Sequence, residues 1–310
     1  MAATAFLFPG QGSQYAGMGK LLAEEFTDAQ RVFEIADEAL GFPLSRLCFE
    51  GPDEELKKTE NTQPALLAVS IAAFRVLEDR GYKPDFVAGH SLGEYSALVA
   101  AGSLDLADAL RLVRKRGQYM QQAVPPGVGA MAAILKLPAS KLDEVLRDAA
   151  EGEVVTAANL NSPDQVVIAG HAAAVERAME LAKRAGAKRA IPLAVSAPFH
   201  CPLMRPAQAR LEVDLDKTEF RDLSIPLINN WQAREITSAH DAREGLYEQV
   251  PNPVRWTDTI CLLAHKGVKR AIEVGAGSVL IGLTRNIDSS IEAMKFGEPL
   301  DMERLTHAFR

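Results

Sequence analysis

Short apolar runs and longer helix-forming stretches alternate along the chain. Apolar runs that are bounded by glycine, proline or polar residues are typical of buried β-strands. Four such runs are residues 5–8, 86–88, 225–229 and 269–274. Their alternation with helical stretches predicts an α/β fold.

The residues between 21 and 80 favour helices, and a helical stretch is expected to begin near Met18. Glycine and proline interrupt this region at 41–43 and 51–53. Thr62-Gln63-Pro64 then precedes the apolar residues 65–77. This pattern predicts a long buried helix with proline in its first turn.

The middle of the chain has a pattern of its own, which begins after the linker-like residues 124–129. Residues 130–135, 154–160, 165–169 and 189–193 are typical of strands, with the turn Asn161-Ser162-Pro163-Asp164 between the second and the third. Helices are expected from Ser140 and over 172–185. The order β-α-β-β-α-β is ferredoxin-like. We therefore interpret residues 127–195 as a small inserted subdomain, and 1–126 with 196–310 as the core.

Composition excludes several classes of protein. Of 310 residues, 47% are hydrophobic and 24% charged, and the net charge is −7, so no general attraction to nucleic acid or an anionic membrane is expected. No apolar run has the length of a membrane span, and the first residues lack the pattern of a signal peptide. Three cysteines without metal-ligand spacing favour a reduced, cytoplasmic protein.

Gly89-His90-Ser91-Leu92-Gly93 lies between an apolar run and a helix-forming stretch. Strand, Gly-x-Ser-x-Gly and helix in this order are typical of a nucleophile elbow, in which the serine lies on a sharp turn. Ser91 is therefore the candidate nucleophile. His90 is adjacent, but an alternating backbone is expected to direct its ring away from Ser91.

A serine nucleophile needs a general base, and His200 is the candidate. It lies in a loop between Pro198 and Pro202, whose rigid backbone would hold an imidazole in place. No acidic residue between Ser91 and His200 is convincingly placed to orient this base, so another group, such as a backbone carbonyl, is required. Cys201 is interpreted as a buried structural thiol.

Two further features bear on the chemistry. The glycine-rich loop at 9–14 lacks the residues of a phosphate loop, and its backbone N–H groups suit an oxyanion better. Arg116 lies near the apolar stripe of a helix that Asp105 opens. A buried arginine must find an anion, either a ligand or a structural ion-pair partner. These residues alone indicate a serine enzyme of acyl transfer with a cationic pocket residue.

Seven motifs then follow one another over residues 5 to about 285. They are Phe8-Pro9-Gly10-Gln11-Gly12-Ser13-Gln14, Gly89-His90-Ser91-Leu92-Gly93-Glu94, Arg116-Gly117, Asn161-Ser162-Pro163, Pro198-Phe199-His200, Asn252-Pro253-Val254-Arg255-Trp256 and Glu273-Val274-Gly275. Together they resemble the malonyl-CoA:acyl carrier protein transacylases of fatty acid synthesis. The resemblance implies an α/β hydrolase-like large subdomain with a parallel sheet and a ferredoxin-like insertion.

The resemblance also implies roles for particular residues and partners. Malonyl-CoA and acyl carrier protein would be the partners of a monomeric, cytoplasmic enzyme that needs neither metal nor cofactor besides the coenzyme A thioester. The implied roles are nucleophile for Ser91, base for His200, main-chain orientation of the base for Gln249, oxyanion donors for Gln11 and Leu92, carboxylate binding for Arg116, malonyl selectivity for Phe199 and substrate binding for Asn161.

Three other functions stay open at this point. A serine thioesterase or esterase would use water as the acceptor and would have no use for Arg116. A catalytically silent interaction module could keep the fold without the reaction. A malonyltransferase of polyketide synthesis would perform the same chemistry in another pathway.

Overall fold

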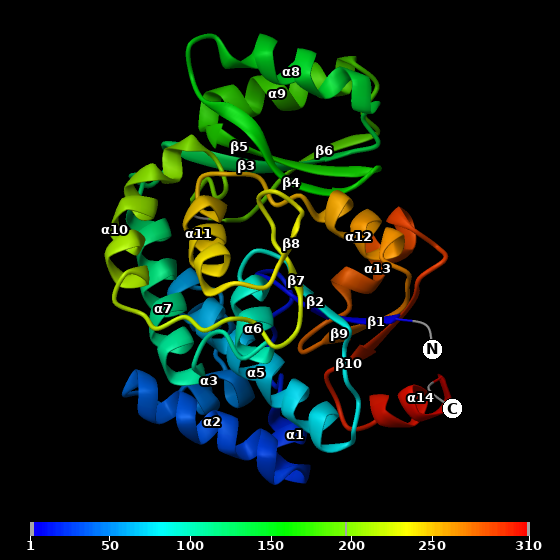
Figure 1. The fold of residues 1–310 in the computed structure, drawn as a ribbon. Helices are drawn as coiled ribbons and strands as arrows, with labels where there is room; N and C mark the ends of the chain where they lie inside the picture. Colours follow the sequence, from blue (N-terminus) through cyan, green and yellow to red (C-terminus); the bar gives the residue numbers. More distant parts are fainter. Residues whose placement is uncertain (1–2, 196, 309–310) are drawn as a thin grey trace.

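The computed structural model describes residues 3–195 and 197–308, and two β-sheets organise them (Figure 1). The larger sheet has the order β10-β9-β1-β2-β7-β8, with all neighbours parallel except β7 and β8. Its strands are β1 (Ala3–Phe8), β2 (Phe86–Gly89), β7 (Leu227–Ile228), β8 (Glu235–Ile236), β9 (Val268–Val274) and β10 (Glu292–Phe296). A mainly parallel sheet in an α/β fold is thus confirmed.

Helices cover both faces of the larger sheet, as a parallel sheet requires. Successive side chains of β1 point to opposite faces, so Phe6 and Phe8 join one buried cluster while Ala5 and Leu7 join another. The helices before the middle region are α1 (Lys20–Glu25), α2 (Thr27–Leu40), α3 (Leu44–Glu50), α4 (Asp53–Leu56), α5 (Thr59–Asp79), α6 (Gly93–Ala100) and α7 (Leu106–Gln122). Those after it are η2 (Pro202–Met204), α10 (Arg205–Leu215), α11 (Ala239–Gln249), α12 (Trp256–His265), α13 (Val279–Ile287) and α14 (Asp301–Ala308).

The smaller sheet is antiparallel, with the order β4-β5-β3-β6. Its elements are β3 (Gly129–Leu135), η1 (Ala139–Lys141), α8 (Leu142–Ala150), β4 (Val155–Ser162), β5 (Gln165–His171), α9 (Ala172–Arg184) and β6 (Arg189–Pro192). Helices α8 and α9 cover one face and share a separate apolar cluster with it. The other face is turned toward the part of the protein that contains the larger sheet, and there β4 packs on α12 and α13 (Figure 1).

The first helix begins at Lys20, near Met18 as expected. Local structure differs from the sequence-based prediction in two places. Strand β7 contains only two of the five residues expected in it. The long helix α5 begins at Thr59, so Pro64 lies inside it rather than in its first turn. Almost all residues of this helix are buried, and their packing offsets the hydrogen bond that proline cannot make.

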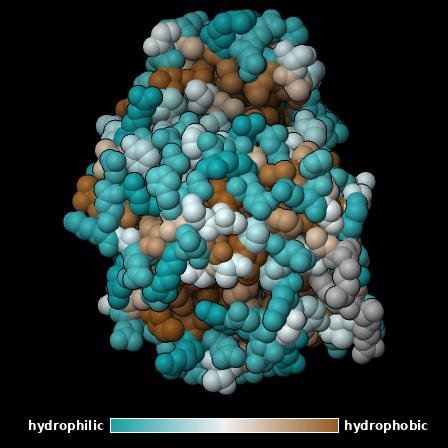
Figure 2. Space-filling view, in the orientation of Figure 1, coloured by the Kyte–Doolittle hydropathy of each residue, from teal (hydrophilic) through white to brown (hydrophobic). Residues whose placement is uncertain are grey.

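The face shown in Figure 2 is mostly hydrophilic, with apolar side chains exposed in small groups. Within residues 3–195 and 197–308, no helix combines the length and the apolar character that a membrane crossing demands.

Helices α5 and α7 approach closely at Gly117, next to the candidate residue Arg116. A Cβ atom at Gly117 would lie 2.7 Å from the Glu60 Cα and 2.8 Å from the Thr59 carbonyl oxygen. Both are backbone atoms of α5, which cannot move aside as a flexible side chain can. The position of Arg116 relative to the sheet therefore depends on a glycine beside it.

We predict that Gly117→Ala lowers the free energy of unfolding by about 1–3 kcal/mol, because it forces the two helices apart. Gly282→Ala is the matched control, since Gly282 lies in α13 with no atom within 4 Å of the added Cβ. That change should stabilise the protein by about 0.5–1 kcal/mol through the helix propensity of alanine. Urea denaturation of both variants measures the difference. Equal effects would contradict the close approach.

Candidate active site

The backbone at Ser91 has the geometry of a nucleophile elbow. Ser91 joins β2 to α6 and has a φ of 52°, in the left-handed region that a serine seldom adopts. A Cβ atom at Gly89 would overlap the carbonyl group of Gly93, and one at Gly93 would overlap the carbonyl oxygen of Phe8. The two glycines therefore allow strand and helix to meet at this angle, with Ser91 at the end of the sheet.

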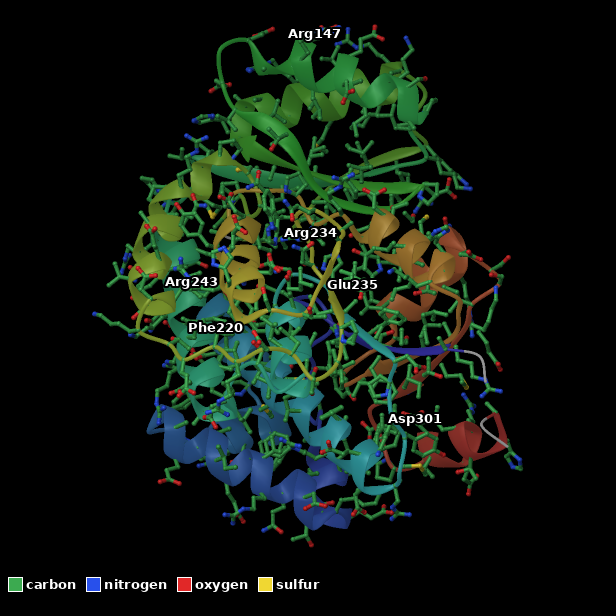
Figure 3. The ribbon with its side chains drawn as sticks, viewed as in Figure 1. Arg147, Phe220, Arg234, Glu235, Arg243 and Asp301 are labelled. Atoms are coloured by element: carbon green, nitrogen blue, oxygen red, sulfur yellow. The ribbon has the colours of Figure 1, made fainter. Side chains whose placement is uncertain are left out.

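An asparagine from a distant segment holds the elbow. Asn230 follows β7, and its Oδ1 accepts a hydrogen bond from the Ser91 N–H at 2.7 Å. Its Nδ2 donates to the Gly89 carbonyl oxygen at 2.6 Å. Asn230 lies in the connection between β7 and β8, and Figure 3 labels Arg234 at the end of this connection and Glu235 at the start of β8. Two bonds from one buried amide thus offset part of the strain at Ser91.

His200 lies directly against the nucleophile. Its Nε2 is 2.7 Å from the Ser91 Oγ, and its Nδ1 is 2.9 Å from the main-chain carbonyl oxygen of Gln249. A carbonyl oxygen can only accept a hydrogen bond, so Nδ1 carries the proton and Nε2 offers its lone pair to Ser91. The geometry suits proton transfer from Ser91 to His200.

The carbonyl that orients His200 belongs to the last residue of α11. The final carbonyl groups of a helix have no partner within it, and the helix dipole makes this end negative. Gln249 therefore presents a free acceptor with partial negative charge, where other serine enzymes place a carboxylate. This accounts for the absence of a suitably placed acidic residue in the sequence.

His200 is buried, and burial is the main reason that its pKa falls to about 3. The positive charge of Arg116 is the second cause, while the bond to Gln249 acts in the opposite direction. Both lowering effects disfavour the imidazolium. The base is therefore neutral, and ready to accept a proton, over the whole physiological pH range.

Arg116 lies in α7 with only 2% of its surface exposed. Its Nη1 donates to Gln63 Oε1 at 2.8 Å, and its Nη2 donates to Gln249 Oε1 at 2.7 Å and to Ser91 Oγ at 3.2 Å. The guanidinium also lies 5.4 Å from the centre of the Tyr95 ring. Among the described residues, no carboxylate forms an ion pair with it. The structural ion pair considered from the sequence is therefore not what holds Arg116.

A cavity of about 120 Å³ opens over these groups. Its lining includes Gln11, Ser91, Leu92, Arg116, Phe199 and His200. Leu92 is the N-cap of α6, and Gln11 lies in the loop after β1. In residues 3–195 and 197–308, neither of their backbone N–H groups has an acceptor. The cavity thus contains a nucleophile, a neutral base, a buried cation and two free backbone donors.

His90 lines the same cavity as Ser91, and its ring lies 5.5 Å from the Trp256 ring, centre to centre. One prediction about a neighbouring residue needs correction. Asn161 lies within β4 rather than in the turn after it, and its Oδ1 is 2.8 Å from His90 Nε2. It lines a larger, adjacent groove of about 530 Å³ instead of the small cavity.

Cys201 is a buried thiol, as expected. Its Sγ lies 3.1 Å from the Pro198 carbonyl oxygen, to which the thiol donates, and burial raises its pKa to about 11. A thiol of this kind is not a nucleophile at neutral pH. Within the described part of the chain, no group of His, Cys, Asp and Glu side chains could hold a metal ion.

Sequence reasoning did not single out Gln63, Glu94 and Asn230 as parts of this site. Gln63 holds Arg116, Asn230 holds the elbow, and Glu94 bonds to both Asn230 and Gln249. Asn230 comes just after an apolar run, and a polar residue at a strand end is a usable signal. Glu94 lies in an otherwise apolar stretch, which marks it as a buried acid. Gln63 carries no such signal.

A nucleophile elbow with a serine–histidine pair, on a mainly parallel α/β sheet, defines a class of serine-dependent acyl-transfer and hydrolytic enzymes. Comparison with known proteins narrows this class. The family model described as the acyl transferase domain matches residues 5–296. The chain belongs to this family.

Relatives of known name agree along nearly the whole chain. The malonyl CoA-acyl carrier protein transacylase of Bacillus subtilis is 50% identical over 304 residues, which are 98% of this chain and 96% of that protein. The protein of the same name from Escherichia coli K12 is 50% identical over 303 residues, 97% of this chain and 98% of the relative. The resemblance seen in the motifs is therefore confirmed.

Solved structures match the fold equally well. An acyl carrier protein S-malonyltransferase from Vibrio cholerae superposes with a TM-score of 0.96 at 47% identity, covering 98% of this chain and all (100%) of that one. A malonyl-transacylase in complex with a type II polyketide-synthase acyl carrier protein gives 0.96 at 46% identity, covering 99% and 100%.

The lowered pKa of His200 leads to a prediction about pH. We expect the rate at which an uncharged fluorophosphonate inactivates the protein through Ser91 to be independent of pH between about 5 and 8, because the base stays neutral there. Stopped-time mass spectrometry of the phosphonylated protein measures this rate, and Ser91→Ala is the blank. A decline toward acid with a midpoint near the ordinary histidine pKa of about 6.5 would contradict the prediction.

Proposed function

We propose that this protein transfers the malonyl group from malonyl-CoA to the phosphopantetheine thiol of acyl carrier protein through a malonyl-serine intermediate. One observation carries the proposal: a buried arginine, which forms no ion pair with a carboxylate of residues 3–195 and 197–308, lies 3.2 Å from the nucleophilic oxygen of a serine–histidine pair. A hydrolase of neutral esters has no use for such a charge. The names of the relatives at 50% identity support the same reaction.

In the first half-reaction, His200 Nε2 takes the proton of Ser91 Oγ as this oxygen attacks the thioester carbonyl. The backbone N–H groups of Gln11 and Leu92 receive the negative charge that develops on the carbonyl oxygen. One such donor typically contributes about 3 kcal/mol to the transition state. The C–S bond then breaks, the coenzyme A sulfur leaves with the proton from His200, and malonyl-Ser91 remains.

The second half-reaction reverses these steps with another thiol. The phosphopantetheine thiol of acyl carrier protein gives its proton to His200 and attacks the malonyl ester. The same two donors stabilise the oxyanion, and Ser91 leaves with the proton from His200. Thioester is exchanged for thioester, so neither an oxidant nor a further cofactor is required.

Arg116 and Phe199 account for the choice of acyl group. The guanidinium offers planar N–H groups that match a carboxylate, and its burial strengthens their interaction. Phe199 lines the same cavity and is 8% exposed. Its ring would crowd a branch on the acyl chain, which favours malonyl over methylmalonyl. Methylmalonyl-CoA as a competing substrate measures this preference in wild type and in Phe199→Ala.

The larger groove suits the pantetheine arm of both substrates. It shares Gln11, His90 and Asn159 with the small cavity, so the two adjoin. Leu280 and Leu283 of α13 give it an apolar wall, while Asn161 and Gln165 provide amides for the peptide-like arm. In this proposal Asn161 binds substrate through the groove. Asn161→Ala should raise the KM for malonyl-CoA with little change in kcat.

We infer the finer architecture from the order of elements. The parallel sheet with its elbow after β2 supports an α/β hydrolase-like core at 1–126 and 196–310. The order β-α-β-β-α-β and the strand order β4-β5-β3-β6 support a ferredoxin-like insertion at 127–195. Limited proteolysis near residues 127 and 195 would test these boundaries.

Pathway and cellular setting are part of the proposal. We assign the protein to fatty acid synthesis, as the names of its curated relatives favour, although one structural relative was solved with a polyketide-synthase carrier protein. We further propose a cytoplasmic monomer, in keeping with a substrate that is a coenzyme A thioester. Light scattering tests the monomeric state, and cell fractionation tests the cytoplasmic location.

Intact-protein mass spectrometry after mixing with malonyl-CoA tests the reaction. We expect a malonyl adduct that is absent in Ser91→Ala and is discharged when holo acyl carrier protein is added. Holo carrier protein should gain the group that Ser91 loses. An adduct lost to water at the same rate without a thiol would instead establish a thioesterase, and no adduct would overturn the proposal.

Arg116→Ala separates selectivity from general catalysis. The substitution removes the buried charge pair between Arg116 and the malonyl carboxylate. We therefore expect the kcat/KM for malonyl-CoA to fall about a hundredfold or more. Acetyl-CoA has no carboxylate, so its kcat/KM should fall much less or rise. Arg116→Lys is a useful comparison, since it keeps the positive charge but lacks the planar guanidinium that binds a carboxylate through two hydrogen bonds. Equal losses for both acyl groups would refute a role in selectivity.

A further inference from the structure

Glu94 is a buried acid that the proposed reaction does not use. It lies in α6, three residues after the nucleophile, and only 1% of its surface is exposed. Its Oε2 accepts hydrogen bonds from Gln249 Nε2 at 2.6 Å and from the Asn230 N–H at 3.2 Å. A carboxylate is rarely buried to this degree without a positive partner. No arginine or lysine of the described residues forms an ion pair with it.

The positively charged group nearest in this network is Arg116, and the side-chain amide of Gln249 lies between it and Glu94. The Gln249 side chain accepts from Arg116 Nη2 through Oε1 and donates to Glu94 Oε2 through Nε2. The positive group therefore meets the negative end of the amide dipole, and the negative group meets its positive end. Each charge polarises the amide in the sense that strengthens the other bond. Two buried charges are thus linked without direct contact.

This separation matters for the substrate. A carboxylate bonded directly to Arg116 would occupy the N–H groups that the acyl carboxylate needs, and would compete with it. Placed behind Gln249, the charge stabilises the guanidinium and leaves its face toward Ser91 available. The chain of contacts also reaches the nucleophile, because Gln249 Nε2 lies 3.0 Å from the Ser91 carbonyl oxygen.

We propose that Glu94 is a positioning residue, the buried counter-ion of Arg116, and that it acts through the side-chain amide of Gln249 to prepare the guanidinium for an acyl carboxylate. The proposal rests on the proposed malonyl transfer, since it assigns Glu94 to the selection of that acyl group. Burial raises the pKa of Glu94 to about 7, and the bonds from Gln249 and Asn230 with the charge of Arg116 act against this rise.

The test compares three reactions of Ser91 at pH 8, where Glu94 is ionised: malonylation, acetylation and phosphonylation by an uncharged fluorophosphonate. Glu94→Gln keeps the size of the side chain and removes its charge. We expect kcat/KM for malonyl-CoA to fall about tenfold, mainly through KM, since pairs in one network couple by this order. Acetylation and phosphonylation should change less than about twofold, because they use Ser91 and His200 without the Arg116 charge.

Glu273→Gln is the matched control. Glu273 is also buried, burial also raises its pKa to about 7, and it lies at the end of β9. Its carboxylate accepts from the Ile281 N–H of α13 and does not contact Gln249. We expect the ratio of malonylation to acetylation to be that of wild type in this variant, which shows that loss of a buried acid is not sufficient.

A second variant and a double-mutant cycle distinguish loss of the Glu94 charge from misfolding of the variant. Glu94→Asp keeps the charge and should retain most of the malonyl preference. In an Arg116→Ala background, Glu94→Gln should add no further loss of malonylation, because the guanidinium through which Glu94 acts is absent. Equal loss in all three reactions, or no loss of malonylation, would overturn the proposal. Failure of the proposed function would be recognised separately, by the absence of a malonyl adduct in wild type.

Discussion

Gln249 connects the groups on which the site depends. Its main-chain carbonyl, free because α11 ends there, accepts from His200 Nδ1. Its side chain bonds to Arg116, to Glu94 and to the Ser91 carbonyl. The orientation of the base and the position of the cation are therefore fixed by one residue. A shift of the end of α11 would disturb both together.

The fold brings these groups together at the carboxyl ends of parallel strands. Gln11 follows β1, Ser91 follows β2 and Asn230 follows β7, which are neighbours in the sheet. The ends of parallel strands meet at one edge, where ligands of α/β proteins usually bind. Arg116 reaches the same edge from α7, whose approach to α5 depends on Gly117. The smaller sheet lies above the larger one in Figure 1, and its strand β4 contributes Asn159 and Asn161 to the lining of the groove.

What the sequence could predict was mostly local. The elbow is a local motif, because the glycines that permit it flank the serine, and the periodicity of α7 placed Arg116 on a buried face. The β-α-β-β-α-β order of elements in the middle region could also be predicted from the sequence. The role of Gln249 could not be derived in this way, because it depends on where a helix ends next to a loop that is 49 residues away in sequence. Only the family resemblance indicated it.

Other features depended on packing that no local pattern contains. Gln63, Asn230 and Glu94 act through contacts with residues 53 to 155 positions away, and an amide side chain carries no periodic signal. The helix start at Thr59 was missed because Pro64 suggested a first turn, whereas burial of the preceding residues extends α5.

A crystal structure of the malonylated protein tests the central claim most directly, namely that one acyl group on Ser91 meets both the oxyanion donors and Arg116. The account predicts the malonyl carboxylate within hydrogen-bond distance of the Arg116 guanidinium, and the ester carbonyl oxygen between the N–H groups of Gln11 and Leu92. A malonyl carboxylate that is turned toward the groove and makes no hydrogen bond to the Arg116 guanidinium would contradict it.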